Sequence, residues 1–381
     1  MLPKRIEQIT PFMVMEILEK AHEMERQGID VIHLEVGEPD FDAPECVKKA
    51  LFQAIQTNKT HYTHSLGILE LRQAICEDYY KKYHVVIDPD QVVVTSGTSP
   101  ALFLIFSVLL DKGDQVIVTD PHYACYSNYI HFMEATPVKI PVVEEDGFQY
   151  RLEDVKQKIN ASTQAIVINS PCNPTGTILS PERMKAIAEC SPYIISDEIY
   201  HGLVYEGNAH SILEYTDHCF VINGFSKLYA MTGLRIGYLI APKAFIRPIQ
   251  KLQQNFFISA NSAVQYAAIT ALKEAEPDVI RMKQIYNERR KMMIAGLKEL
   301  GFRINVEPTG AFYVFVNARH LGENSYQLAF DILNKAHVGV APGIDFGQHG
   351  EGYLRFCYAN SIENIQKGML RLHEYIQGLQ Q

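Results

Sequence analysis

Residues 223–238 read NGFSKLYAMTGLRIGY and place Lys227 and Arg235 among small and polar neighbours. The stretch follows an apolar run, Phe220 to Ile222, which is typical of a buried strand. A lysine amine becomes a nucleophile when burial or nearby cations lower its pKa, and an arginine offers a planar fork for a phosphate. The pair therefore suits a ligand that carries both an aldehyde and a phosphate. The alternative is a surface lysine and arginine that flank a hairpin.

Short apolar segments alternate with helical patterns before this stretch, which predicts an α/β fold with a mostly parallel sheet and helices on both faces. The expected strands are 91–95, 116–119, 138–143, 165–169, 194–196, 220–223 and 237–240, and the helices between them are 101–110, 121–133, 152–159 and 181–189. Polar residues just past the carboxyl ends of such strands form the ligand crevice. Four groups lie there: Thr95–Thr98, Asn169–Asn173, Asp197 and Ser226–Lys227. They predict one shared site.

The rest of the chain predicts further helices and a second, smaller α+β domain. The expected helices are 11–26, 44–56, 68–82, 243–255, 263–274, 278–300, 326–335 and 362–379, and the expected strands are 31–34, 303–307, 312–316, 338–341 and 353–359. We expect three parts. Residues 1–40 form an arm and helix that join the small domain, residues 41–285 form the large domain, and residues 286–381 form the small domain.

The composition is that of a soluble globular chain with a sizeable core, since 47% of the 381 residues are hydrophobic and 21% are charged. The chain has a net charge of −9 and contains no run of basic residues. Both features argue against nucleic acid or a membrane as a partner. The seven cysteines form no Cys-x-x-Cys pair, which favours a reducing cytoplasm over a disulfide framework or a zinc site. No signal peptide is expected, and the apolar run 101–110 is too short for a bilayer.

Several motifs occur in the order and with the spacing of one enzyme family. They are Gly37, Tyr62, Ser96-Gly97-Thr98, Tyr123, Asn173-Pro174-Thr175-Gly176, Asp197 with Tyr200, Lys227, Arg235 and Arg355. In these motifs the chain resembles the class I and II aminotransferases, fold type I enzymes that use pyridoxal 5'-phosphate (PLP), and most of all their bacterial aspartate-aminotransferase-like branch. The resemblance covers nearly the whole chain. It implies a three-layer fold, with PLP in the large domain, and a transferase of amino acid metabolism.

The resemblance implies three catalytic residues. Lys227 would hold the cofactor covalently and, once substrate frees it, carry the proton between the substrate Cα and the cofactor. Asp197 would pair with the pyridine nitrogen and keep the ring electron-withdrawing. Tyr200 would donate to the 3'-oxygen of the cofactor, which Asn173 would reach from the other side. The alternatives are a helix cap for Asp197, packing for Tyr200 and a plain turn around Asn173.

The resemblance also assigns residues to the other parts of the ligand. The phosphate would lie on Ser96, Gly97 and Thr98 at a helix N-terminus, with Ser226 and Arg235. The chain departs from related enzymes at Gly224, where a serine is frequent. Tyr123 would stack on the cofactor ring, with ordinary packing as the alternative.

Arg355 would clamp the substrate carboxylate, helped by Asn173 and the backbone of Gly37. An arginine inside an apolar strand needs an anionic ligand or a buried acid. Tyr62 would reach the cofactor phosphate of a neighbouring subunit, so the resemblance implies a homodimer.

A residue for an acidic substrate side chain is not evident. Ser99 stands where some aspartate enzymes carry a lysine, and Arg247 and Arg281 lie on exposed helical faces. Neutral or aromatic amino acids are therefore the expected donors, selected by the loops around Phe12, Val36 and Ile258. No metal site is expected, because His33, His61, His64, His122 and His201 lack ligand spacing.

The leading prediction is a PLP-dependent aminotransferase that moves the amino group of an L-amino acid to a 2-oxo acid in a ping-pong cycle. The runner-up is a carbon–sulfur β-lyase of the same fold, which the motifs do not distinguish. A non-enzymatic amino-acid sensor is third, because the chain has no added basic segment for DNA.

Overall fold

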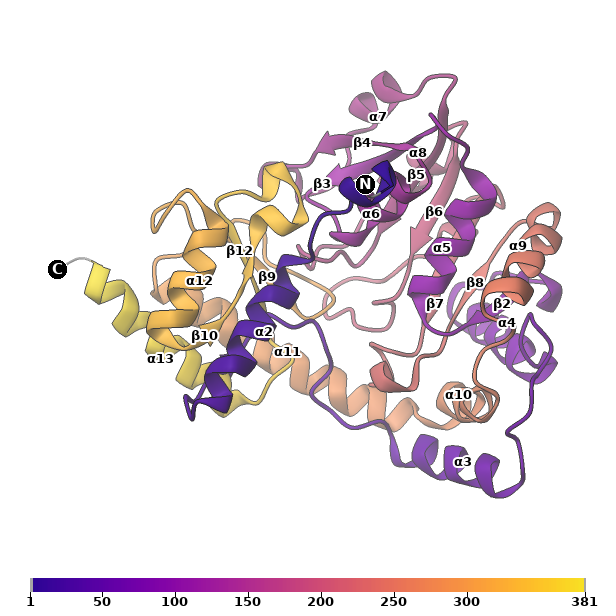
Figure 1. Ribbon diagram of the computed structural model, residues 1–381, viewed down its shortest axis with the longest axis horizontal. Helices are drawn as coiled ribbons and strands as arrows, with labels where there is room; N and C mark the ends of the chain where they lie inside the picture. The colour runs from indigo at the N-terminus through magenta and orange to yellow at the C-terminus, as the bar shows by residue number, and fades with distance from the viewer. Residues whose placement is uncertain (1–2, 380–381) are drawn as a thin grey trace.

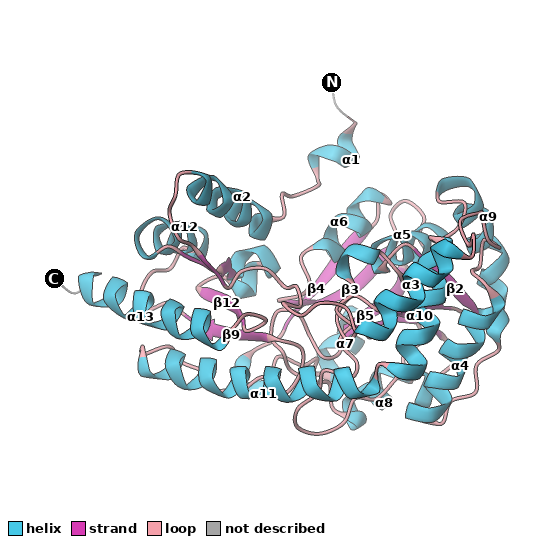
Figure 2. Ribbon diagram, turned by 90° about the horizontal axis from the view of Figure 1, so that it is seen from below, coloured by secondary structure: helices cyan, strands magenta, loops and turns pink. Residues whose placement is uncertain are grey.

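A seven-stranded sheet forms the centre of the larger unit, with helices on both faces (Figures 1 and 2). The computed structural model describes residues 3–379. The strands are β2 (Val92–Thr95), β3 (Gln115–Asp120), β4 (Thr136–Pro141), β5 (Thr163–Asn169), β6 (Tyr193–Asp197), β7 (Cys219–Gly224) and β8 (Gly237–Ile240), in the order β2-β8-β7-β6-β5-β3-β4. Strand β8 runs opposite to the other six strands of this sheet, which are parallel to one another. The predicted fold class is confirmed.

Both faces of this sheet are buried, which explains the continuous apolar strands. Val93 and Phe220 face a core covered by α5 (Thr98–Leu109), α6 (Cys125–Phe132) and α9 (Lys243–Phe256). Val92 and Val221 face the opposite core, because successive strand residues point to opposite sides. That core is covered by α4 (Leu69–Tyr83), α7 (Leu152–Lys158) and α8 (Pro181–Ala188).

The smaller unit contains two further sheets. The strands β9 (Tyr313–Asn317), β11 (Ala341–Pro342) and β12 (Tyr353–Cys357) form an antiparallel sheet, and β1 (Ile32–His33) pairs in parallel with β10 (Val338–Gly339). The helices of this unit are α12 (Ser325–Ala336) and α13 (Ile362–Leu379). Helix α2 (Met13–Arg26) packs against α12 and β11 of the smaller unit (Figure 1). A short helix, α1 (Lys4–Glu7), precedes it.

Two of the remaining helices belong to the large unit, and a third extends to the smaller one. Helix α3 (Glu45–Gln56) packs against α10 (Ser262–Glu274), and α11 (Glu276–Glu299) runs from the large unit along the smaller one (Figure 2). The predicted domain boundary at residue 285 falls inside α11. The division into three parts stays a prediction.

Two expected strands are wrong. Residues 303–307 form only an isolated bridge from Arg303 to Asn317, because the backbone N–H and side chain of Asn305 bind the buried carboxylate of Glu144 instead of a strand. Residues 338–341 are not one strand but two, β10 and β11, which belong to different sheets.

One expected helix begins later than predicted. Residues 121–124 precede α6 and are not helical, because the N–H of His122 donates to the carbonyl of Phe346 in the smaller unit. Among the described residues, no helix is long and apolar enough to cross a membrane.

Candidate active site

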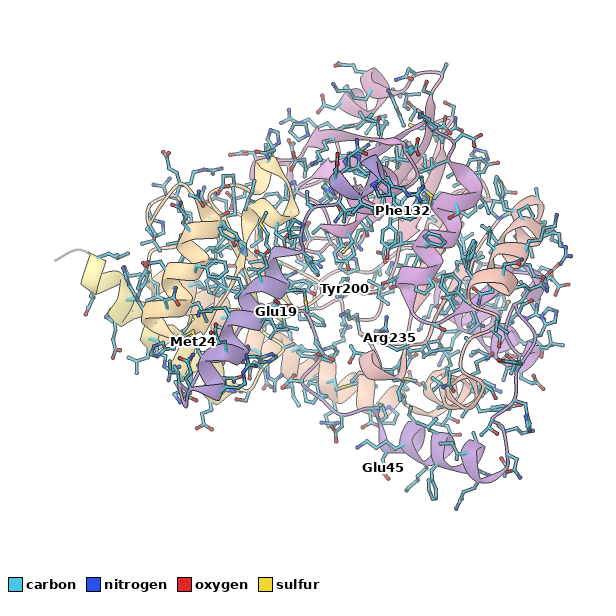
Figure 3. The ribbon with its side chains drawn as sticks, in the orientation of Figure 1. Glu19, Met24, Glu45, Phe132, Tyr200 and Arg235 are labelled. Carbon is cyan, nitrogen blue, oxygen red and sulfur yellow. The ribbon has the colours of Figure 1, made fainter. Side chains whose placement is uncertain are left out.

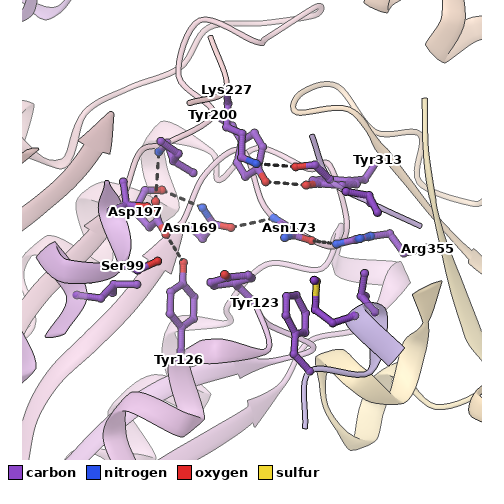
Figure 4. A pocket seen from close by; sticks show the side chains of 18 residues that line it. Ser99, Tyr123, Tyr126, Asn169, Asn173, Asp197, Tyr200, Lys227, Tyr313 and Arg355 are labelled. Atoms are coloured by element: carbon purple, nitrogen blue, oxygen red, sulfur yellow. Dashed lines mark hydrogen bonds between the residues drawn. The ribbon is translucent and has the colours of Figure 1, made fainter. Parts of the chain in front are cut away.

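A cavity of about 200 Å³ lies between the carboxyl ends of the large sheet and the smaller unit (Figure 4). In Figure 3, Tyr200 lies in the middle of the view, between the two units. Eight of the predicted site residues line the cavity: Gly37, Thr98, Tyr123, Asn173, Asp197, Tyr200, Lys227 and Arg355. The strand-end argument therefore located the crevice, and the smaller unit adds Arg355 from β12.

Lys227 follows β7 and points its amine into this cavity. Its Nζ donates to the carbonyl of Gly37 at 2.5 Å and lies 5.8 Å from the ring centre of Phe312. Burial, with smaller contributions from the charges of Arg355 and Arg235, lowers the pKa of the amine to about 8. A large fraction of the amine is therefore neutral near pH 8, as a nucleophile or a base requires.

Asp197 ends β6 and faces the same cavity. Burial raises the pKa of its carboxyl to about 6, while hydrogen bonds from the Tyr126 hydroxyl at 2.6 Å and the Ile199 N–H at 3.2 Å oppose that rise. A buried carboxylate with a raised pKa is poised to gain a cationic partner.

A chain of hydrogen bonds joins the end of β6 to Arg355 (Figure 4). The Asn169 amide donates to the carbonyl of Asp197 at 2.9 Å, and the Asn173 N–H donates to the Asn169 side chain at 2.8 Å. Arg355 Nη1 then donates to Asn173 Oδ1 at 2.7 Å. The large unit thus fixes the position of an arginine that belongs to the smaller one.

Arg355 is only 2% exposed, yet both of the acceptors it reaches are uncharged. They are Asn173 Oδ1 and the backbone carbonyl of Glu35, which follows β1. Its buried Nε has no hydrogen-bond partner among the described residues. A buried cation with a free donor fits a carboxylate ligand.

The N-terminus of α5 faces a second cation. Gly97 caps this helix with φ 96°, and a Cβ at this position would lie 2.6 Å from Arg235 Nη2. The absence of a side chain at Gly97 therefore lets the guanidinium approach the free N–H groups of the helix. This combination fits a phosphate.

The other residues predicted to bind the ligand do not line the cavity themselves. Ser96 precedes Gly97, and Ser226 is buried next to Lys227. Gly224 is closely packed, since a Cβ there would lie 3.1 Å from the Cα of Gly237. Tyr62 does not line the cavity and is 82% exposed.

Three further polar side chains line the cavity: Tyr126, Asn169 and Tyr313. Asn169 had a sequence signal, since it belongs to a strand-end group. Tyr126 lies in α6, which begins after Tyr123, so no helical spacing relative to Tyr123 marked it in the sequence. Tyr313 lies in an apolar strand and had no separate signal.

Part of the cavity lining is apolar. Phe12, Val14, Met15, Val36 and Leu102 line it, together with Ser99. Lys227 and Arg355 are its only lysine or arginine side chains among the described residues. Ile258 does not line the cavity, and Arg247 and Arg281 are exposed on helices, as expected.

One histidine cluster has ligand-like geometry. Atoms of His22, Glu25 and His33 lie within 4.8 Å of one another. His33 bonds to Glu35 at 2.7 Å and to Glu25 at 3.1 Å, and the hydrogen bond to Glu35 is the main reason that its pKa rises to about 9. Ion pairing of a protonated His33 between two carboxylates accounts for this cluster.

Comparison with known proteins agrees with this geometry. The family described as aminotransferase class I and II matches residues 29–372. The chain is 43% identical over 380 residues to the (5-formylfuran-3-yl)methyl phosphate transaminase of Methanocaldococcus jannaschii, covering 99% of this chain and 100% of the relative. It is 39% identical over 386 residues to the aspartate aminotransferase of Pyrococcus horikoshii, covering 99% and 97%.

Two solved structures are similar over nearly their whole length. A crystal structure from Methanococcus jannaschii, described as similar in its active site to kynurenine aminotransferases, gives a TM-score of 0.92 at 43% identity and covers 99% of this chain and 100% of that one. The aspartate aminotransferase of Thermus thermophilus with maleate gives 0.94 at 36% identity, covering 98% and 99%.

Proposed function

Because the chain belongs to the class I and II aminotransferase family, whose members use PLP, we propose that it binds PLP in this cavity through Lys227. The chain is an aminotransferase, an enzyme that moves the amino group of an amino acid to a 2-oxo acid. The single observation that carries the proposal is that Lys227, Asp197 and Arg355 line one cavity. The cofactor requires an amine and a carboxylate, and the amino acid requires a cation that binds its own carboxylate.

The residues of the site would hold PLP by its phosphate and by its ring. The N–H groups of Gly97 and Thr98 with the Arg235 guanidinium would hold the phosphate, and Ser96 and Ser226 lie beside them. Tyr123 would stack on the ring, and Tyr200 and Asn173 would bind its 3'-oxygen. When bound, PLP supplies an aldehyde for the amino group and a ring that withdraws electrons from the substrate Cα.

The side chains of the protein then have separate tasks. Asp197, as a carboxylate, holds the cationic ring nitrogen. Arg355 orients the substrate through its carboxylate, with Gly37 and Asn173 beside it. The Lys227 amine, whose pKa is lowered to about 8, would carry the proton from the substrate Cα to the cofactor in the first half of a ping-pong cycle, and from the cofactor to the Cα of the second substrate in the second half.

The lining supports a neutral or aromatic amino donor. A second carboxylate on the substrate would need a cation, and the described lining offers only Lys227 and Arg355, which already have tasks. Phe12, Met15 and Leu102 offer apolar contact instead. The relatives act, by their names, on substrates as different as aspartate and a furan phosphate, so the lining rather than the names supports this choice.

We also propose a homodimer in which Tyr62 reaches the phosphate of the neighbouring subunit. A tyrosine that is 82% exposed outside its own cavity supports this placement. Exposed apolar side chains that a second subunit could cover include Phe52, Ile55 and Phe256. All seven cysteines lie within the described residues as free thiols, which supports a cytoplasmic location.

Replacement of Lys227 tests the proposed function. Purified protein with PLP should show a visible absorption band that a neutral or aromatic amino acid bleaches and a 2-oxo acid restores. Lys227→Ala should lose turnover and the restored band. Normal turnover in this variant contradicts the proposal, and ammonia release without any 2-oxo acid would identify a lyase instead.

A further inference from the structure

Tyr313 contacts two groups of the site at once. It lies in β9, is 1% exposed and lines the cavity (Figure 4). Its hydroxyl lies 2.7 Å from the hydroxyl of Tyr200, and its ring centre lies 4.4 Å from Arg355 Cζ. No role has yet been given to this side chain.

The hydrogen bond between the two hydroxyls has a preferred direction. Among the described residues, Tyr200 is the only hydrogen-bond partner of the Tyr313 hydroxyl. If Tyr200 donated, the Tyr313 proton would have no acceptor and Tyr200 would have no proton for a ligand. If Tyr313 donates, its proton is satisfied and the Tyr200 proton is free to point into the cavity.

Gly37 keeps the space that this arrangement needs. A Cβ at position 37 would lie 1.9 Å from the hydroxyl oxygen of Tyr313, so any side chain there would displace it. The carbonyl of Gly37 also accepts the hydrogen bond from Lys227. The Tyr313 hydroxyl therefore packs closely against the backbone of Gly37.

We propose that Tyr313 is a positioning residue that donates to Tyr200, directs the Tyr200 proton toward the 3'-oxygen of PLP, and supports Arg355 with its ring. The inference rests on the proposed function, because it takes PLP as the ligand of Tyr200. It adds a residue that acts through Tyr200, and it separates the effect of the Tyr313 hydroxyl from the effect of its ring.

The hydroxyl has a spectroscopic consequence. A donor at the 3'-oxygen stabilises the anionic form of that oxygen, so loss of the donor raises the pH midpoint of the visible absorption of bound PLP. Tyr200→Phe removes the donor and should raise the midpoint by about one to two pH units. Tyr313→Phe keeps this donor but weakens its hydrogen bond to the 3'-oxygen, because a hydrogen bond received by a hydroxyl strengthens the bond that the hydroxyl donates by roughly 10–30%. This variant should therefore raise the midpoint by only a few tenths of a pH unit.

A double-mutant cycle separates action through Tyr200 from an independent effect. In the Tyr200→Phe background, Tyr313→Phe should cause no further shift of the midpoint. Tyr358→Phe is the matched control, because Tyr358 is a buried tyrosine of the same unit that bonds to the Ala311 carbonyl at 3.2 Å and does not line the cavity. It should leave the midpoint unchanged.

The ring is tested by the Michaelis constant. Tyr313→Phe keeps the aromatic face over Arg355 and should leave KM for the amino donor within about twofold of wild type. Tyr313→Leu removes that face and should raise KM about tenfold. Because the ring is fully buried, its replacement by leucine could disturb folding. The folding of the leucine variant is therefore checked by circular dichroism.

Two results would overturn the inference: no midpoint shift in Tyr313→Phe, or an equal shift with and without the Tyr200 hydroxyl. Equal KM values for the phenylalanine and leucine variants would overturn the role of the ring. A wild-type protein without a visible PLP band would instead overturn the proposed function, so the two failures are distinguishable.

Discussion

At the scale of single residues, burial in one cavity shifts two opposite groups in opposite directions. It raises the pKa of Asp197 to about 6 and lowers the pKa of Lys227 to about 8, because a buried site disfavours both charges. A cationic ring nitrogen would restore the negative charge of Asp197. These two groups therefore contribute to the preference of the site for such a ligand.

The proposed pairing of Asp197 with the ring nitrogen predicts an affinity for PLP that depends on pH. Only its carboxylate form pairs with the ring nitrogen, so affinity is full above pH about 6 and should fall up to about tenfold for each pH unit below it. The phosphate titrates near pH 6 as well, so Asp197→Asn is the control that isolates the carboxylate. PLP titration of the apoprotein from pH 5 to pH 8 measures both.

Tyr126→Phe should move this pH dependence upward, because the Tyr126 hydroxyl lowers the pKa of Asp197. An identical pH dependence in wild type and Asp197→Asn would show that Asp197 does not pair with the cofactor.

Arg355→Lys tests the carboxylate clamp. A lysine lacks the planar fork, so KM for the amino donor should rise about a hundredfold while PLP affinity stays near that of wild type. Steady-state kinetics and PLP titration measure the two quantities. Arg281→Lys on the exposed face of α11 should change neither, and a matching rise in KM there would point to a general effect of arginine replacement.

At the scale of elements, the proposed phosphate site at the N-terminus of α5 depends on a glycine. Gly97→Ala puts a Cβ at a φ of 96° and next to Arg235, so it should cost about 1–3 kcal/mol of stability and lower PLP affinity at least tenfold. Gly113→Ala is matched, because its φ is 93° and a Cβ there meets nothing within 4 Å. It should lose stability only. Thermal unfolding and PLP titration of both variants test this, and equal PLP affinities would refute the phosphate assignment.

The strands explain what could be predicted from the sequence. Asp197 and Lys227 follow apolar runs directly, and parallel strands bring their carboxyl ends together, so their shared cavity could be predicted. Tyr313 and Tyr126 could not, because their partners come from elements far apart in the chain. Residues 338–341 look like one strand locally, and only tertiary packing divides them between two sheets.

At the scale of the whole molecule, the site exists only where the two units meet. Arg355 comes from β12, and its supports come from Glu35 beside β1 and from Asn173 in the large unit. Pairing of β1 with β10, and of β11 with β12, brings the start and the end of the chain to the same arginine. A displacement of the smaller unit would therefore affect the binding of the substrate at Arg355 more than the binding of the cofactor in the large unit.

The proposed dimer predicts complementation between two defective subunits. Lys227→Ala and Tyr62→Ala proteins should each be impaired, the latter at limiting PLP. A mixed dimer should contain one intact site, since Lys227 of one subunit meets Tyr62 of the other. Activity at limiting PLP after co-refolding should exceed that of either parent. If Tyr62 acts within its own subunit, mixing restores nothing.

The most direct test of the central claim is the position of covalently attached PLP. The holoenzyme is reduced with borohydride and digested, and the peptides are sequenced by mass spectrometry. The account predicts that the mass of reduced PLP is found on the peptide that contains Lys227, at that residue. Attachment at another lysine, or no attachment in a protein that transfers amino groups, would contradict it.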